Sequence, residues 1–239
     1  MNSLSRAFPN SLSPIIGAPQ LANLLAELGL CTAFELSDKA LGVPITTSRS
    51  TWVRQHTAST GSYFVKTYDY PSAWSQCRGW LRNTGPLCRS RAASEAKALI
   101  WLKGHGLPAP RPVVVLESRR FTLLTMAVVV TTAFPGCSLD HLLPTLPMHR
   151  RLHLAKQLGC YIRHLHQLGF RDRNLDLRNL LARELPDQSF ELTKIDSGRH
   201  RIVPPGHAED RLTRADWARL LPQLAQFGIA AAVRAAATT

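Results

Sequence analysis

Four polar residues have types and an order along the chain that suit phosphoryl transfer. Lys66 ends the apolar stretch SYFVK, and Glu95 lies in RAASEAKAL. Asn179 lies in LDLRNLL, and Asp196 follows the apolar stretch ELTKI. Phosphoryl transfer depends on positioning and charge neutralisation more than on covalent chemistry. A lysine can bind nucleotide phosphates, a carboxylate can hold that lysine, and an amide oxygen with a second carboxylate can hold Mg²⁺.

Each of the four residues also has an ordinary explanation. Lys66 would be an exposed strand lysine and Glu95 a solvent-facing helix residue, because such side chains are mostly exposed. Asn179 would lie in a turn, and Asp196 begins the common turn sequence Asp-Ser-Gly. Their order separates the two explanations: strand lysine, helix glutamate, long helix, polar loop with asparagine, strand, then Asp-x-Gly. This order matches the protein-kinase scheme.

The elements that carry Lys66 and Glu95 follow from periodicity and turn chemistry. Residues 50–68 alternate in strand fashion around a turn at 58–61, so they predict a hairpin that carries Lys66. Residues 90–104 predict the helix that carries Glu95. The remaining elements expected in this half are a helix at about 20–28, a loop or short helix at 71–89, a strand at 113–116, a tight turn at Arg119–Arg120 and a buried strand at 121–132.

The elements around Asn179 and Asp196 belong to a mostly helical second half. A polar loop at 171–182 runs into a short strand, and residues 190–195 predict its partner strand. The helices expected here are a short one within 134–143, a long one at 148–168 with Leu152, Leu154, Leu158, Ile162 and Leu165 on its apolar side, and one at 211–225 before an Ala-rich tail.

Together these elements predict an α+β, protein-kinase-like fold with two lobes. The small N-lobe, residues 20–132, would hold an antiparallel sheet and a helix for nucleotide binding. The reduced, mostly helical C-lobe, residues 133–239, would hold the catalytic loop and the metal site. Residues 1–19, rich in Ser, Pro and Asn, predict a flexible tail. Neither GxGxxG nor GxxxxGK[ST] occurs, so Rossmann and P-loop folds lose their main support.

Composition bears on partners and location. The formal net charge of +13 favours anionic partners, namely phosphates, nucleic acid or an acidic membrane surface. A nucleic-acid-binding protein is the weakest of these, because no helix-turn-helix, zinc or RNP-type motif occurs and aromatic residues make up 7%. The five scattered cysteines form no CxxC pair and suit a reducing cytoplasm. No apolar run is long enough to span a membrane, so we expect a cytoplasmic protein, peripheral at most at the inner membrane.

Four stretches carry a resemblance to a known family: SYFVKTYDYP, SRAASEAKALIWLKGHGLPAPRPV, LGCYIRHLHQLGFRDRNLDLRNLLA and LTKIDSGRHRI. From about Trp52 to Leu221 the chain resembles the lipopolysaccharide kinase (Kdo/WaaP) family, small bacterial kinase-like enzymes that phosphorylate sugars of the lipopolysaccharide inner core. The resemblance implies ATP and Mg²⁺ as cofactors and a Kdo or heptose hydroxyl, or a similar small substrate, as acceptor. Contact with an anionic membrane surface would accompany such an acceptor.

The resemblance also implies a role for each of the four residues. Lys66 would bind the α- and β-phosphates of ATP, and Glu95 would pair with Lys66. Asn179 and Asp196 would bind Mg²⁺.

One departure from the family pattern concerns the catalytic base. The family's loop looks like G-F-x-H-R-D-L-x-x-R-N, whereas residues 169–179 read G-F-R-D-R-N-L-D-L-R-N. Asp172 stands at the histidine position and Asn174 at the catalytic aspartate position. An amide accepts a hydrogen bond from a hydroxyl but cannot take up its proton as a carboxylate can.

Three interpretations of this exchange stay open. Asp172 or Asp176 supplies the carboxylate from a neighbouring position, and Asp172 is the preferred substitute. Alternatively, the transition state is loose enough for the amide of Asn174 to suffice at a reduced rate. In the third interpretation the protein is a pseudokinase that binds nucleotide without transferring phosphate.

Overall fold

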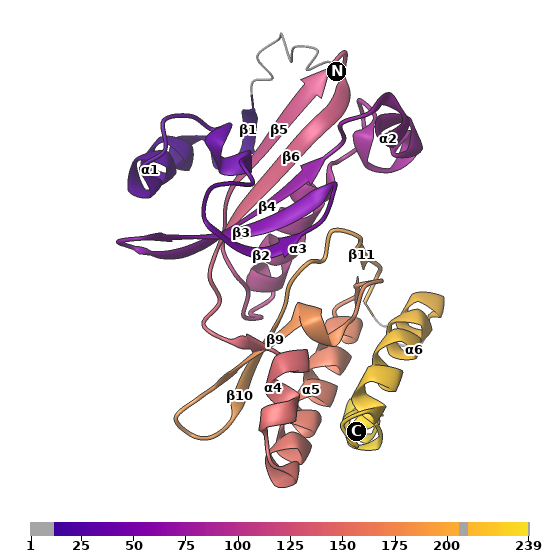
Figure 1. The fold of residues 1–239 in the computed structure, drawn as a ribbon. Helices are drawn as coiled ribbons and strands as arrows, with labels where there is room; N and C mark the ends of the chain where they lie inside the picture. The colour runs from indigo at the N-terminus through magenta and orange to yellow at the C-terminus, as the bar shows by residue number, and fades with distance from the viewer. Residues whose placement is uncertain (1–11, 206–209, 239) are drawn as a thin grey trace. The chain divides into compact units, whose positions relative to one another are not determined.

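The computed structural model describes residues 12–205 and 210–238, which divide into two compact units (Figure 1). Unit 1 contains the described residues up to Lys97 together with Arg111–Ala133. Unit 2 contains Ala98–Pro110 and the described residues from Phe134 onward. Residues 98–110 thus group with unit 2, whereas the sequence placed them in the N-lobe. The reason is packing, since Leu99 and Leu102 of this segment are buried in the core of unit 2.

Unit 1 is built on a six-stranded antiparallel sheet with the order β1-β5-β6-β4-β3-β2. Its strands are β1 (Ser13–Ile16), β2 (Val43–Thr47), β3 (Thr51–Ala58), β4 (Gly61–Asp69), β5 (Pro112–Arg120) and β6 (Leu123–Thr132). Its helical elements are α1 (Ala18–Leu28), η1 (Glu35–Ser37), α2 (Ala73–Arg78), η2 (Trp80–Thr84) and the start of α3 (Arg91–Gly104). The predicted hairpin of residues 50–68 and the predicted helix of residues 90–104 are confirmed.

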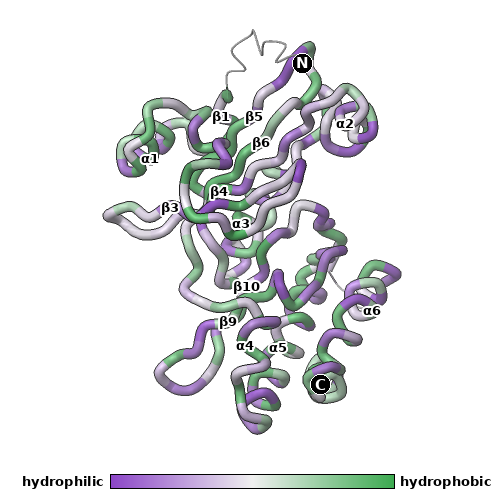
Figure 2. Tube along the Cα trace, viewed as in Figure 1, coloured by the Kyte–Doolittle hydropathy of each residue, from purple (hydrophilic) through white to green (hydrophobic). Residues whose placement is uncertain are grey.

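The centre of the sheet is buried on both faces, as the apolar sequence of β6 predicted. Figure 2 shows the hydropathy of the residues along these strands. On one face, Val65 of β4 and Val128 of β6 pack with Leu24 of α1. On the other face, Val129 of β6 packs with Ala96 of α3. Successive strand residues point to opposite faces, so a single strand serves both layers.

Two predictions in this unit were wrong. Ser13–Ile16 form edge strand β1 against β5 instead of belonging to a flexible tail. An edge position tolerates Pro14, which has no N–H to donate. Residues 1–11 of the predicted tail lie outside the described residues. Arg119–Arg120 continue β5, and the turn lies at Phe121–Thr122, which have positive φ angles of 48° and 69°.

Unit 2 has a helical core with two small antiparallel sheets, β10-β9-β7 and β11-β8. Its strands are β7 (Cys137–Ser138), β8 (Phe170–Arg171), β9 (Leu180–Glu184), β10 (Phe190–Lys194) and β11 (Arg201–Ile202). Its helical elements are α4 (Leu139–Thr145), α5 (Met148–Gln167), η3 (Leu177–Asn179), α6 (Arg211–Ala225) and α7 (Ala230–Thr238). The predicted long helix, the paired strands at 180–184 and 190–194 and the helix at 211–225 are confirmed.

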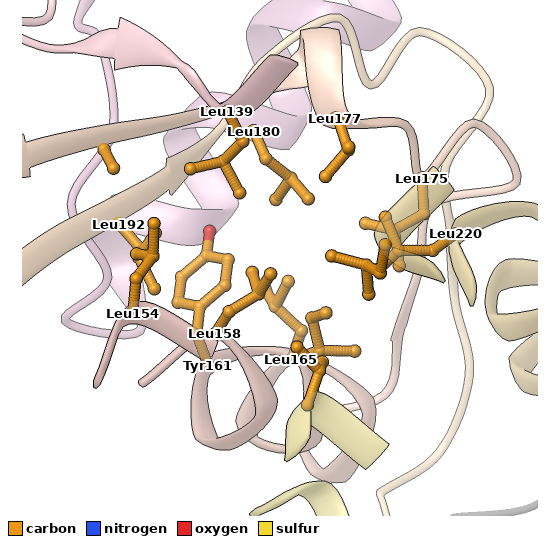
Figure 3. Close-up of a cluster of buried hydrophobic side chains, with 14 of the residues drawn as sticks. Leu139, Leu154, Leu158, Tyr161, Leu165, Leu175, Leu177, Leu180, Leu192 and Leu220 are labelled. Atoms are coloured by element: carbon orange, nitrogen blue, oxygen red, sulfur yellow. The ribbon is translucent and has the colours of Figure 1, made fainter. Parts of the chain in front are cut away.

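The core of unit 2 joins α5 to the polar loop that follows it. Figure 3 shows Leu158 and Leu165 of α5 pointing toward Leu175 and Leu177, which lie within the loop. The prediction that Leu152 lies on the apolar side of α5 was wrong, because Leu152 is exposed. Since the loop itself contributes side chains to this core, its backbone is held by packing as well as by hydrogen bonds.

The Ala-rich C-terminal segment is helix α7, where the sequence predicted only a tail. Small side chains let α7 approach α5 closely. A Cβ atom on Gly159 of α5 would lie 2.4 Å from the carbonyl oxygen of Val233, which shows how close the two backbones are. Val233 is fully buried in the core of unit 2.

Candidate functional site

Lys66 and Glu95 form a shielded ion pair within unit 1. The Lys66 Nζ lies 3.1 Å from the Glu95 Oε2, and their side chains are only 14% and 9% exposed. The Tyr68 hydroxyl donates to the same oxygen over 2.9 Å. Because the carboxylate is held from two sides, it fixes the direction of the ammonium group.

The alternation of side chains along β4 and the N-terminal cap of α3 determine where the Lys66–Glu95 ion pair lies. Lys66 and Tyr68 are two residues apart on β4, so both face the side of the sheet that α3 covers. The Ser90 hydroxyl accepts from the Ala93 N–H over 3.0 Å and caps the N-terminus of α3. Glu95 therefore lies in the first two turns of a helix whose N-terminus is capped.

The polar loop of unit 2 begins at Gly169, which has a φ angle of +90°. A Cβ atom there would lie 2.0 Å from the carbonyl oxygen of Val203, so only glycine fits. The loop then receives support from Asp216 of α6. The Asp216 carboxylate accepts from the N–H groups of Asp172 and Arg173 over 3.1 and 2.8 Å. Arg173 has a positive φ of 61°, which these two hydrogen bonds help to hold.

Hydrogen bonds to backbone carbonyl oxygens bring the segments that carry Asn174, Asn179 and Asp196 together. The Asn179 Nδ2 donates to the Asn174 carbonyl oxygen over 3.3 Å. The Asn179 carbonyl oxygen accepts from the N–H of Ile195, the residue before Asp196, over 2.9 Å. Asp196 has a positive φ of 56°, a left-handed conformation that aspartate adopts more readily than most other residues. The hydrogen bond to Asn174 uses the amide nitrogen of Asn179, so the amide oxygen is the side-chain atom that could bind a ligand.

Asp172 lies in the interior of unit 2, where it is paired with a lysine. It is 2% exposed, and its Oδ2 lies 3.2 Å from the Nζ of Lys194, which is completely buried. The same oxygen accepts from the Asn174 N–H over 3.2 Å. Burial raises the pKa of Asp172, and the charge of Lys194 opposes this shift. Its carboxylate therefore supports the backbone of Asn174 and is not presented at a surface.

Lys194 also supports the segment that carries Asp196. Its Nζ donates to the carbonyl oxygen of Ile195 in addition to pairing with Asp172. One buried ammonium group thus connects the Asn174 loop with the residue that precedes Asp196.

Asp176, the other acid considered as a substitute base, is engaged by arginines. Its Oδ2 lies 3.2 Å from guanidinium nitrogens of both Arg178 and Arg219, and its Oδ1 accepts from the Arg178 N–H as the cap of η3. Although burial opposes the shift, the hydrogen bonds from Arg178 hold the pKa of Asp176 below its usual value. A lowered pKa makes a carboxylate a weaker proton acceptor.

The sequence analysis did not identify three residues that support the site: Lys194, Asp210 and Asp216. Asp210 caps α6 through Leu212 and Thr213, and its Oδ2 lies 3.0 Å from the Nε of the fully buried Arg171. Its position directly before a predicted helix was a signal for such a cap. The signal for Asp216 was an acid on the apolar side of that helix.

The chemistry available to this constellation is that of oxygen donors. Among the described residues, no cluster of three or more His, Cys, Asp or Glu side chains could hold a metal ion. The Asn179 amide oxygen and the Asp196 carboxylate are hard ligands, and Mg²⁺ is commonly bound by one or two such groups together with phosphates and water. The donor set therefore fits Mg²⁺ and does not fit a zinc site.

Comparisons with known proteins agree with the kinase-like pattern. The model of the family described as "Lipopolysaccharide kinase (Kdo/WaaP) family" matches residues 46–232. A solved structure described as "WaaP in complex with acyl carrier protein" is similar with a TM-score of 0.58 and 15% sequence identity, covering 87% of this chain and 79% of that chain. At this identity the likeness establishes the fold, which is α+β and kinase-like. No curated protein matches the chain.

Proposed function

Because the chain belongs to the lipopolysaccharide kinase (Kdo/WaaP) family, we propose that it transfers phosphate from ATP to a sugar hydroxyl of the lipopolysaccharide inner core, on Kdo or heptose. Membership makes the protein a phosphotransferase that uses ATP. The observation that carries the location of the transfer site is the pair of hydrogen bonds joining Asn179 to Asn174 and to the residue before Asp196.

Lys66 is proposed to bind the α- and β-phosphates of the nucleotide. Its ion pair with Glu95 orients the ammonium group before the nucleotide arrives, which reduces the entropy lost on binding.

We expect Glu95→Gln to raise the Kd for ATP about tenfold, because the ion pair with Lys66 is replaced by a weaker hydrogen bond from the ammonium group to an uncharged amide. Tyr68→Phe is the matched variant, since it removes the other hydrogen bond to Glu95 and leaves the charge. Its effect should be smaller. Isothermal titration calorimetry checks both, and equal affinities for wild type and Glu95→Gln would contradict the role of this pair.

Asn179 and Asp196 are proposed to hold Mg²⁺, whose charge would neutralise the phosphate oxygens when it is bound. The side chain of Asn179 is oriented by its hydrogen bond to Asn174, so its oxygen is presented without rotamer freedom. The left-handed backbone of Asp196 sets the direction in which its side chain leaves the chain.

Asn174 is proposed to contact the acceptor hydroxyl, and Asp172 is proposed to position Asn174. The burial of Asp172 and its pairing with Lys194 favour this division over direct proton transfer to Asp172. An amide suffices to orient a hydroxyl when the transition state is loose, because the hydroxyl proton then needs to pass to solvent water only late in the transfer of the phosphoryl group. This assignment predicts a slow enzyme.

The proposed binding of nucleotide is tested by a thermal-shift titration with ATP and Mg²⁺. At about 100 times Kd, wild type should gain about 2.7 kcal/mol, seen as a higher Tm. Asp196→Ala should lose the part of this gain that depends on Mg²⁺. Asp187→Ala, at an exposed aspartate of unit 2, is the matched control and should behave like wild type. A wild-type Tm that ATP and Mg²⁺ do not change would remove the proposed nucleotide site.

The pseudokinase is the second candidate function, and Asn174 is the observation that favours it. Both candidates bind nucleotide, so turnover separates them. Formation of ADP and of a phosphorylated core sugar, measured by mass spectrometry, supports the kinase. Tight ATP binding with neither product supports the pseudokinase.

The acceptor also bears on location. Among the described residues, no helix has the length and apolar character needed to cross a bilayer. A lipid-linked acceptor and the excess of arginine together favour a cytoplasmic protein that binds peripherally to the anionic inner membrane.

A further inference from the structure

Unit 1 exposes large apolar side chains between β4 and α3 and at the β5–β6 turn. Leu87 is 99% exposed, Leu81 is 88% exposed and Phe121 is 85% exposed. Trp74 of α2 is also largely exposed. Single exposed apolar residues are ordinary, but several such residues on neighbouring segments mark an interaction surface.

Arg119 ties these segments together. Its guanidinium group donates to the carbonyl oxygens of Gly85 and Cys88 over 3.0 and 3.3 Å, and Leu87 lies between these two residues. It also donates over 3.1 Å to the carbonyl oxygen of Thr122, which follows Phe121 in the turn. Leu87 and Phe121 therefore lie on one surface, although they are far apart in the sequence. The segments α2 and η2 lie against β6 of the same sheet (Figure 1).

The conformation of the turn is unusual for its sequence. Tight hairpin turns with positive φ at both central residues favour Asn-Gly or Asp-Gly. Here the two positions hold Phe121 and Thr122, with φ of 48° and 69°. A bulky residue in this region is strained, and its side chain is exposed instead of buried. The strained turn therefore holds the Phe121 side chain in solvent and does not contribute to the packing of unit 1.

The exposed charged side chains of these segments are basic. Residues 70–94 contain four arginines and no Asp or Glu, and residues 118–139 contain two arginines and no acid. Arg82 and Arg120 are exposed, and the Arg120 guanidinium carbon lies 5.4 Å from the centre of the Phe121 ring. Arg119 is neutralised by Glu117 at 2.7 Å, so the exposed charge comes from the other arginines.

We propose that Leu81, Leu87, Phe121 and Trp74, with Arg82 and Arg120, form a docking surface for a bilayer rich in anionic headgroups. Apolar and aromatic side chains enter the interface, and arginines bind lipid phosphates. A bilayer suits such largely exposed side chains, because its fluid surface does not need to be complementary to them in shape. The inference extends the membrane contact of the proposed function, but it depends only on residues of unit 1.

The test is co-sedimentation of the full chain with vesicles of phosphatidylethanolamine and phosphatidylglycerol, and with vesicles of phosphatidylcholine alone. Wild type should bind the anionic vesicles at least tenfold more tightly, because each arginine near the surface contributes. Leu87→Ser/Phe121→Ser should lower the partition coefficient about tenfold through lost apolar burial. Val43→Ser/Ile45→Ser is the matched control, since both residues are exposed and apolar on β2 of the same unit. It should bind like wild type.

A second pair of variants separates the contribution of arginine charge to vesicle binding from that of apolar burial. Arg82→Gln/Arg120→Gln should weaken binding and reduce its salt dependence, whereas Arg49→Gln/Arg111→Gln, at exposed arginines elsewhere in unit 1, should not. ATP affinity is measured for every variant and should stay unchanged, so failure of docking is distinguished from failure of the proposed kinase. Wild type that ignores anionic vesicles would overturn the inference. So would variants of this surface that lose only self-association and bind anionic vesicles like wild type.

Discussion

Replacing Lys194 by methionine is expected to lower the free energy of unfolding by about 3–5 kcal/mol. The substitution keeps most of the apolar stem but leaves the Asp172 carboxylate buried without its counter-charge. Urea denaturation followed by circular dichroism measures the loss. Lys156→Met, at an exposed lysine on α5 of the same unit, is the matched control and should change stability by less than about 0.5 kcal/mol.

A double variant separates the cost of an unpaired charge from lost packing. Asp172→Asn/Lys194→Met removes both charges and retains an oxygen that can accept from the Asn174 N–H. It should recover most of the stability, because replacing both partners of a buried pair is often neutral. If the double variant is as unstable as Lys194→Met, charge pairing is not what holds this loop. If it is stable but turns over more slowly with unchanged affinity for ATP, Asp172 has a positioning role.

Converting Asn174 to aspartate is expected to raise kcat for phosphotransfer about 100-fold, at the low end of what a positioned general base contributes. The substitution restores a carboxylate at the position where the family pattern has one, with no change in side-chain length. Affinity for ATP should change little. Product formation with a core-sugar acceptor measures the effect, and detectable transfer in the variant alone would identify the wild type as a pseudokinase.

The control for this variant is Asn23→Asp, which introduces the same charge at an exposed position of α1 in unit 1. It should leave kcat unchanged. A kcat for Asn174→Asp equal to or below that of wild type would mean that proton transfer is not limited by this residue. The proposed assignment of Asn174 would then be wrong.

Elements with a strong local pattern were predicted from the sequence. The hairpin that carries Lys66, the helix that carries Glu95 and the long helix α5 each show a clear period and a turn or cap at their ends. The approximate places of Asn179 and Asp196, after a polar loop and after a strand, were found for the same reason.

Elements that depend on distant partners were not predicted. Strand β1 exists because β5, about 100 residues later, offers it an edge, and its own sequence contains Pro14. The turn at Phe121–Thr122 lacks the glycine or asparagine that usually marks one. The Asp172–Lys194 pair could not be seen, because a lysine inside an apolar strand does not reveal which carboxylate it will meet.

The hydrogen bonds from Asp216 have a consequence for how the protein is made. The loop at residues 172–173 is fixed by a carboxylate that lies more than 40 residues further along the chain. During synthesis the loop sequence therefore leaves the ribosome well before the group that completes it. Until α6 has formed and docked, the nascent chain carries the whole loop motif without its native geometry. If the loop acts as proposed, the protein can transfer phosphate only after this late helix has docked.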